Sequence, residues 1–250
     1  MQIRFDGQTG IVTGAGSGIG AAIARELAAS GACVIAADRD LPKAEAVVAE
    51  ITAAGGKAFA AGGDVADPET MKALVALAVE KGGQLNLLVN NAGIGGPQAP
   101  VGDYPLDGWR QVMSINLDAV FYGIRFAIPQ MLIAGGGAIV NMASILGSVG
   151  FANSSAYSTA KHGLLGLTRT AALEYAGKGI RINSVGPAFI DTPLLSALPP
   201  EARAGLAALH PVGRLGTSEE VAHLVTFLLS DKALFINGSY HLIDGGYTAQ

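Results

Sequence analysis

Tyr157 and Lys161 lie four residues apart in a stretch whose spacing predicts a helix over 154–176, so their side chains share one helix face. A phenol is a poor acid–base catalyst at its ordinary pKa of about 10, but a nearby ammonium favours the phenolate and lowers that pKa. Ser144 follows an apolar strand predicted over 138–143, and its hydroxyl could hold a substrate oxygen. These three residue types indicate general acid–base chemistry at a substrate oxygen. The alternatives are an ordinary exposed helix pair and a serine that caps a loop.

A glycine-rich loop, Thr13-Gly14-Ala15-Gly16-Ser17-Gly18-Ile19-Gly20, joins the first predicted strand to the first predicted helix. Its pattern is G-x-x-x-G-x-G rather than the strict G-x-G-x-x-G. Glycines let the backbone approach a pyrophosphate closely, and the phosphate charge meets the N-terminus of the following helix. A glycine loop alone is a weak signal. Its position in the first β-α-β unit makes a nucleotide site the favoured interpretation.

Asp38 ends the second predicted strand about 20 residues beyond the glycines, where a dinucleotide fold places an acid on the adenosine ribose. Its carboxylate could accept hydrogen bonds from the ribose hydroxyls and would repel a 2′-phosphate, which favours NAD over NADP. The neighbouring Arg39 could face a 2′-phosphate, but the glycine loop has no basic residue to join it. Asp64 and Val65, after the third strand, could contact the adenine. Asp38 could instead cap a helix, and Asp64 could be a turn residue.

The elements that must position these residues alternate between short apolar strands and longer amphipathic helices. Strands that alternate with helices imply parallel β-α-β units with right-handed crossovers, and ligands then lie at the carboxyl ends of the strands. We therefore predict one Rossmann-like, doubly wound α/β domain over residues 1–250, with a seven-stranded parallel sheet and helices on both faces. The predicted strands cover 10–13, 33–37, 57–61, 85–90, 138–143, 180–185 and 240–243. The predicted helices cover 19–29, 41–54, 68–80, 106–132, 154–176 and 219–229.

The composition excludes several classes of protein. Half of the residues are hydrophobic and 14% are charged, which excludes a disordered chain. The net charge of −4 argues against a nucleic-acid partner. The uncharged stretch 126–157 is broken by glycines and polar residues, so we expect no membrane span. Cys33 is the single cysteine and the N-terminus lacks a signal-peptide pattern, so we expect a cytoplasmic protein. The four histidines lack metal-ligand spacing, and we expect no metal.

Taken together, the motifs resemble those of the short-chain dehydrogenase/reductase family over nearly the whole chain. Each motif is weak alone, but all of them occur in the family's order and spacing. Besides the glycine loop and Ser144, they are Asn90-Asn91-Ala92-Gly93, Asn116, Tyr157-Ser158-Thr159-Ala160-Lys161 and the segment from Pro187 to Thr192.

The resemblance implies a role for each of four catalytic residues. Tyr157 would be the general acid in carbonyl reduction and the base in alcohol oxidation. Lys161 would lower the pKa of Tyr157 and bind the nicotinamide ribose, and Ser144 would polarise the substrate oxygen. Asn116 would support a water that links Lys161 to solvent. We expect the positive charges near the phenol to outweigh the cost of burying the phenolate, so that the pKa of Tyr157 is lowered.

The resemblance also implies a nicotinamide dinucleotide, and Asp38 marks a preference for NAD. Asn90 is expected to line this cofactor as well. One departure concerns Pro187-Ala188, where the family usually has Pro-Gly; alanine accepts fewer backbone conformations, which leaves the geometry of this loop open. The implied cofactor contacts are Gly14, Ser17, Gly18, Ile19, Asp38, Asp64, Val65, Asn91, Ala92, Gly93, Tyr157, Lys161, Pro187, Ile190 and Thr192.

The function implied is an NAD(H)-dependent oxidoreductase that interconverts a secondary alcohol and its ketone. The alternatives are a 3-oxoacyl-(acyl-carrier) reductase, which usually takes NADPH, and a non-catalytic relative that binds a nucleotide. The segment at about 188–213 is expected to form a substrate lid. Its mostly apolar residues point to an uncharged small-molecule substrate, or else they merely pack the lid on the core. The identity and stereochemistry of the substrate stay open.

We also expect a homotetramer, because the resemblance implies pairing through 106–132 and 154–176, with a second contact through 238–247. Two distinct isologous contacts build D₂ symmetry. Small and apolar residues on 154–176 suit close helix pairing, although they could equally pack against the chain's own sheet. They are Ala156, Ala160, Gly163, Leu164, Leu165, Gly166, Leu167, Ala171 and Ala172.

Overall fold

The computed structural model describes residues 3–196 and 199–249. Seven strands form its sheet: β1 (Thr9–Thr13), β2 (Cys33–Asp38), β3 (Lys57–Gly62), β4 (Leu87–Asn90), β5 (Gly137–Met142), β6 (Ile180–Pro187) and β7 (Tyr240–Ile243). They pair in parallel in the order β3-β2-β1-β4-β5-β6-β7. The strand order reverses beside β1, which leaves a crevice at the carboxyl ends of β1 and β4. The predicted doubly wound parallel sheet is confirmed.

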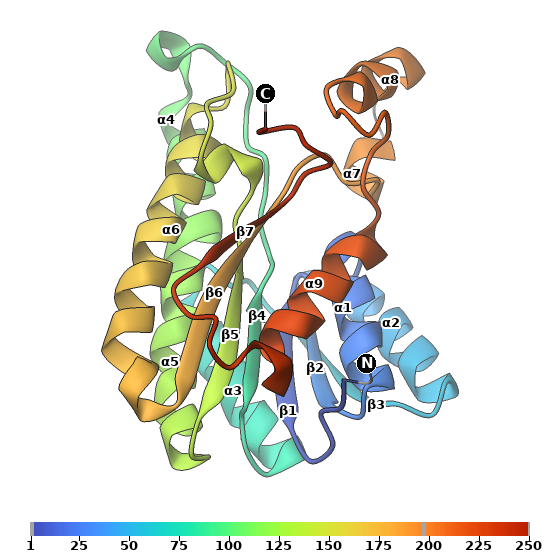
Figure 1. Ribbon diagram of the computed structural model, residues 1–250, viewed down its shortest axis with the longest axis vertical. Coiled ribbons are helices and arrows are strands. Elements are labelled where there is room, and N and C mark those ends of the chain that lie inside the picture. The colour runs from blue at the N-terminus through green and yellow to red at the C-terminus, as the bar shows by residue number, and fades with distance from the viewer. Residues whose placement is uncertain (1–2, 197–198, 250) are drawn as a thin grey trace.

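Helices cover both faces of this sheet, because its central strands are buried throughout and need apolar partners on either side. One core joins the sheet to the first group of helices and a second core joins it to the other group (Figure 1). The first group is α1 (Gly18–Ala29), α2 (Leu41–Ala53) and α9 (Ser218–Leu229). The second group is α3 (Pro68–Gly82), α5 (Ala119–Ile133) and α6 (Ser155–Tyr175).

The helix predicted over 106–132 is interrupted. It consists of α4 (Leu106–Met113), a π-helical turn over Ser114–Asp118 and then α5. A π turn inserts one extra residue into the helical ladder, and such turns are frequent at functional sites. The apolar spacing continues through the turn, so the sequence pattern did not reveal the interruption. Asn116 lies in the middle of the π turn.

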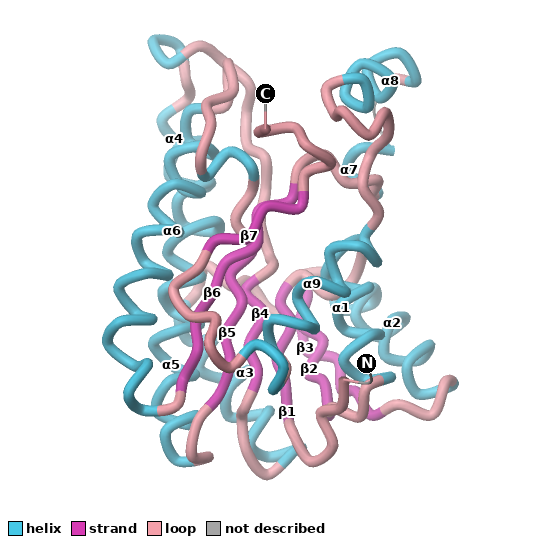
Figure 2. Tube along the Cα trace, viewed as in Figure 1, coloured by secondary structure: helices cyan, strands magenta, loops and turns pink. Residues whose placement is uncertain are grey.

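Loops gather at the carboxyl end of the sheet, together with the short helices α7 (Pro193–Ser196) and α8 (Pro200–Ala208) (Figure 2). Two main-chain hydrogen bonds tie the two ends of this segment together. The Asp191 N–H donates to the Gly216 carbonyl at 2.8 Å, and the Gly216 N–H donates to the Phe189 carbonyl at 3.1 Å. The expected lid over 188–213 is therefore a loop whose two ends lie side by side.

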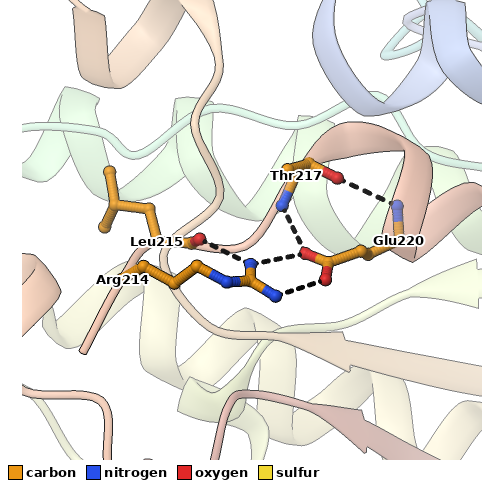
Figure 3. Close-up of polar contacts among 4 residues, drawn as sticks. All are labelled: Arg214, Leu215, Thr217 and Glu220. Carbon is orange, nitrogen blue, oxygen red and sulfur yellow. Dashed lines mark hydrogen bonds and ion pairs between the residues drawn. The ribbon is translucent and has the colours of Figure 1, made fainter. Parts of the chain in front are cut away.

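The start of α9 follows directly after this loop and is firmly capped. The Thr217 hydroxyl accepts from the Glu220 N–H at 3.2 Å, and the Glu220 carboxylate accepts from the Thr217 N–H at 2.9 Å, which is a capping box. Figure 3 shows that Arg214 also donates to both oxygens of this carboxylate, at 2.9 and 2.6 Å. The hydrogen bonds from Arg214 and Thr217 hold the pKa of Glu220 at about 2, so the carboxylate stays ionised in this contact.

Candidate active site

The glycine loop is fixed against the end of β4. Gly14 has φ +66°, a left-handed conformation that favours glycine, and a Cβ on Gly20 would overlap the Gly14 carbonyl. The Asn91 amide donates to the Thr13 carbonyl at 2.8 Å and to the Gly14 carbonyl at 3.3 Å. Ser17 begins α1 without a side-chain cap hydrogen bond, so its side chain does not occupy the N–H groups of the first turn. The loop thus presents backbone N–H groups at a helix N-terminus, which suits a phosphate.

Asp38 lies at the end of β2 and binds the glycine loop. Its Oδ2 accepts from the Gly16 N–H at 2.9 Å, and its Oδ1 accepts from the Asp40 N–H at 2.9 Å. Each carboxylate oxygen has a second lone pair, so Asp38 can still accept from a ribose hydroxyl. Arg39 lies beside it on the same cavity.

A cavity of about 300 Å³ brings most of the expected cofactor residues together. Its lining includes the N-terminus of α1, the carboxylates of Asp38 and Asp64, and the apolar Val65. This combination fits the pyrophosphate and adenosine of a dinucleotide. The expected residues on its wall are Gly14, Ser17, Gly18, Ile19, Asp38, Asp64, Val65, Asn91, Ala92, Gly93 and Thr192.

A second cavity, of about 320 Å³, adjoins the first and is lined by three of the four expected catalytic residues. Ser144, Tyr157 and Lys161 all line it, and Pro187 and Ile190 form part of its wall. Both cavities share a group of residues that marks their boundary. These are Ile19, Asn91, Gly93, Ile94 and Thr192.

Lys161 and Tyr157 lie close together within this second cavity. The Lys161 side chain is buried, its Nζ donates to the Met142 carbonyl at 2.7 Å, and Nζ is 5.4 Å from the centre of the Tyr157 ring. Burial disfavours the ammonium and lowers the pKa of Lys161 to about 8.

Burial also raises the pKa of Tyr157 above its ordinary value, while a hydrogen bond with the Ser144 side chain acts in the opposite direction. The expectation that neighbouring charge lowers the pKa of Tyr157 is therefore wrong for the protein's own groups. The physical reason is desolvation, which disfavours both the phenolate and the ammonium that was expected to stabilise it.

Ser144 is held from two sides. Its Oγ accepts from the Leu146 N–H at 3.2 Å at the start of the 3₁₀ turn η3 (Ile145–Gly147). Its carbonyl accepts from the Tyr240 hydroxyl at 2.6 Å. Tyr240 carries no signal in the sequence, because it lies 96 residues from Ser144 and reaches it only through the pairing of β7 with β6. A Cβ on Gly186 would overlap the Tyr240 ring, so glycine at that position makes room for it.

Asn116 and Asn90 line neither of these two cavities. The Asn116 amide donates to the Ile94 carbonyl at 2.8 Å, and its Oδ1 accepts from the Ile94 N–H at 2.8 Å. Asn116 thereby fixes a loop that forms a wall of both cavities. Asn90, expected along the cofactor, is instead buried and donates to Asn141 Oδ1 at 2.9 Å.

Ala188, where the family pattern has glycine, fits without strain. It does not have a positive φ; among the described residues other than glycine, only Asn153 does. The Ala188 N–H donates to the Ile243 carbonyl at 3.2 Å, so the chain after Pro187 stays joined to β7.

Residues 14–248 match the family model described as enoyl-(acyl carrier protein) reductase. The chain is 50% identical to cyclohexanol dehydrogenase of Acinetobacter sp. (strain SE19), covering 100% of this chain and 98% of the relative. It is 47% identical to cis-4-hydroxycyclohexanecarboxylate dehydrogenase of Sinomonas cyclohexanicum, covering 100% of both. A crystal structure of a putative NAD(P)-dependent gluconate 5-dehydrogenase from Beutenbergia cavernae, with NADP bound at low occupancy, superposes with a TM-score of 0.93. That protein is 38% identical, with 100% of both chains covered.

The fold, the glycine loop and the Ser144, Tyr157 and Lys161 cavity define a dehydrogenase of the doubly wound type. The chain belongs to the short-chain dehydrogenase/reductase family. It is an oxidoreductase that uses a nicotinamide cofactor. In the described part of the chain, no helix is both long and apolar enough to cross a membrane. The same residues contain no group of three or more side chains that could hold a metal.

Proposed function

We propose that the protein oxidises a secondary alcohol on a six-membered carbon ring to the ketone, and the reverse, with NAD(H). The observation that carries this proposal is that Ser144, Tyr157 and Lys161 line one largely apolar cavity directly beside the glycine-loop cavity. Two relatives that match the whole chain are named for cyclohexanol and for a hydroxycyclohexanecarboxylate. These names support the same reaction on a ring alcohol for this chain.

In oxidation, the Tyr157 oxygen takes the proton of the alcohol hydroxyl while the Ser144 hydroxyl holds that oxygen in place. Lys161 stabilises the phenolate, and Asn116 keeps the Ile94 loop at the wall of the site and supports proton relay to solvent. The residues of the glycine-loop cavity, together with Tyr157, Lys161, Pro187 and Ile190, would hold the cofactor. When bound, the nicotinamide supplies the hydride chemistry by accepting hydride from the carbinol carbon.

The substrate is proposed to be uncharged. Of the described residues that line the second cavity, only Lys161 is charged, and its ammonium already donates to the Met142 carbonyl. A carboxylate on the substrate would therefore be buried without a cation dedicated to it, which is costly. The segment 188–213 is proposed as the lid over this cavity, since Phe189 and Leu195 line it.

The test of the proposed function is alcohol-dependent formation of NADH by the purified protein. We expect turnover of cyclohexanol and a lower kcat/KM for cis-4-hydroxycyclohexanecarboxylate. Reduction of an acetoacetyl thioester with NADPH serves as the comparison reaction for an acyl-carrier reductase. A kcat/KM for that thioester well above the value for cyclohexanone would contradict the proposal.

Cofactor preference gives a direct prediction. We expect kcat/KM to favour NAD over NADP by a free energy on the order of 1–3 kcal/mol, because the Asp38 carboxylate would face the 2′-phosphate. Asp38→Asn removes the charge but keeps an oxygen for the Gly16 N–H, so the preference should shrink while the loop stays in place. Asp40→Asn is the matched control, since Asp40 does not line the cavity. Equal kcat/KM for both cofactors in the unaltered protein would refute the role of Asp38.

We propose that the protein is a homotetramer, paired in part through the helices α5 and α6. Ala156, Ala160, Ala171 and Ala172 are buried within the chain's own core and are not available to a partner, and Leu164 and Leu165 are buried as well. Outward-facing apolar side chains on α5 and α6 support the pairing instead. They include Ile133 (80% exposed) and Leu173 (84% exposed).

The second pairing surface lies beside β7, which is the last strand of the sheet and leaves one edge unpaired. Leu234 and Phe235 precede this strand and Leu242 lies on it, and all three side chains are exposed. Two such surfaces are what D₂ symmetry requires.

Sedimentation at micromolar concentration is expected to give a tetramer of the 25.2 kDa chain. Leu173→Glu should yield dimers held by the β7 surface, and Phe235→Glu should yield dimers held by the helix surface. The double variant should be monomeric, because each substitution buries a charge at one of the two contacts. A monomer in the unaltered protein would contradict the assembly.

A further inference from the structure

The second cavity, which contains Ser144, Tyr157 and Lys161, is called the substrate cavity from here on. A third cavity, of about 290 Å³, adjoins it. The two cavities share three consecutive residues, Ala188, Phe189 and Ile190. Among these three residues, Phe189 has the largest side chain. The far side of the wall is lined by His210, Val212, Arg214, Glu220, His223 and Asp244.

The Phe189 ring is held in place by three other aromatic rings from separate parts of the chain. The ring centres of Phe151, His210 and Tyr247 lie 6.1, 5.8 and 6.0 Å from that of Phe189, all in edge-to-face arrangements. Such arrangements are favoured because the positive edge of one ring meets the negative face of another. The wall between the cavities is thus an ordered ring rather than a freely rotating side chain.

The main chain under this ring is fixed independently of it. The Phe189 N–H donates to His210 Nε2 at 3.4 Å, and the Phe189 carbonyl accepts from the Gly216 N–H at 3.1 Å. His210 Nδ1 lies 2.9 Å from the Leu206 carbonyl, so Nδ1 carries the hydrogen and Nε2 is the acceptor. Removing the ring would therefore leave the chain at 189 in place.

The substrate cavity also has to hold the nicotinamide half of the cofactor, because Asn91, Pro187 and Thr192 line it. Only part of its roughly 320 Å³ is left for the substrate. We propose that the Phe189 ring is the partition that closes this remaining space and limits the substrate to a single ring without a bulky substituent. This inference rests on the proposed oxidation of ring alcohols.

The test compares cyclohexanol with two larger probes, 4-tert-butylcyclohexanol and decahydro-2-naphthol, in the full-length protein with NAD. Phe189→Ala joins the two cavities, so the ratio of kcat/KM for a large probe to that for cyclohexanol should rise about tenfold or more. Phe189→Leu should give a smaller rise in the same ratio. Leu195→Ala is the matched control, since Leu195 lines the substrate cavity but not the third cavity.

The possible outcomes distinguish a failure of the proposed Phe189 partition from a failure of the proposed function. No turnover of cyclohexanol by the unaltered protein overturns the proposed function and the size limit with it. Turnover by the unaltered protein, with an unchanged ratio in Phe189→Ala, overturns the partition alone. An equal rise in Leu195→Ala would also overturn it, because general enlargement of the substrate cavity would then explain the gain. Thermal unfolding and NADH binding establish that each variant is folded, and Phe189→Leu decides the question if Phe189→Ala does not fold.

Discussion

Replacing Tyr157 with phenylalanine is expected to lower kcat for alcohol oxidation by about 10²- to 10⁴-fold, the usual contribution of general acid–base catalysis. The phenol oxygen is the proposed proton acceptor, whereas the ring itself mainly fills space beside Lys161. Affinity for NADH should change little, because the glycine loop and Asp38 lie in the adjoining cavity. The measurements are steady-state kinetics with a ring alcohol and NADH titration by fluorescence.

Tyr175→Phe is the matched control for this change. Tyr175 is on the same helix, α6, but lies at its far end and lines neither the cofactor cavity nor the substrate cavity. It should retain the kcat of the unaltered protein. If Tyr157→Phe keeps more than about a tenth of that kcat, the proton is taken by another group.

Replacing Lys161 with methionine is expected to move the pH dependence of oxidation upward. Burial lowers the pKa of Lys161 to about 8 and raises that of Tyr157 above its ordinary value of 10. The two groups titrate as a coupled pair, in which the ammonium favours the phenolate. The proposed oxidation needs the phenolate, so kcat/KM should rise with pH through one ionisation of this pair and then level off.

In Lys161→Met only the phenol remains to titrate. Desolvation raises the pKa of an acid whose charged form is the anion, and the cation that opposed this effect is gone. The rise in kcat/KM should therefore be displaced beyond pH 10. A profile across about pH 6 to 10.5, below and above the ordinary tyrosine pKa, measures this shift.

Lys178→Met provides the control for that shift. Lys178 Nζ lies 4.7 Å from the centre of the Tyr175 ring, so the same kind of pair is altered away from the site. Its pH profile should match that of the unaltered protein. An unchanged profile in Lys161→Met, with activity retained, would show that Lys161 has no electrostatic part in proton transfer.

The fold could be predicted because each strand is a short apolar run that a helix separates from the next. Residues that end such strands must meet at one edge of a parallel sheet. For this reason Asp38, Ser144 and the glycine loop could be expected at the same edge of the sheet. Helical spacing predicts that Tyr157 and Lys161 share one helix face, whereas their catalytic roles are implied by the family resemblance.

Other features depend on contacts that have no local signal. Asn90 pairs with Asn141 because the register of β4 and β5 places the two side by side, and a strand pattern does not fix that register. The side of α6 that carries Ala160 and Ala172 packs inward, although their composition suits either a core or a partner. Burial of Tyr157, which reverses the expected direction of its pKa, likewise depends on loops from distant parts of the chain.

The paired ends of the segment that contains α7 and α8 have a consequence for how this enzyme could diversify. Because the Asp191 N–H is hydrogen-bonded to the Gly216 carbonyl, the chain between Thr192 and Arg214 can change length or sequence without displacing β6 or α9. The capping box and the ion pair between Arg214 and Glu220 then fix the start of α9, where this segment ends. The segment can therefore be exchanged between relatives as a unit. Such an exchange is expected to change substrate selectivity while Ser144, Tyr157 and Lys161 stay in place.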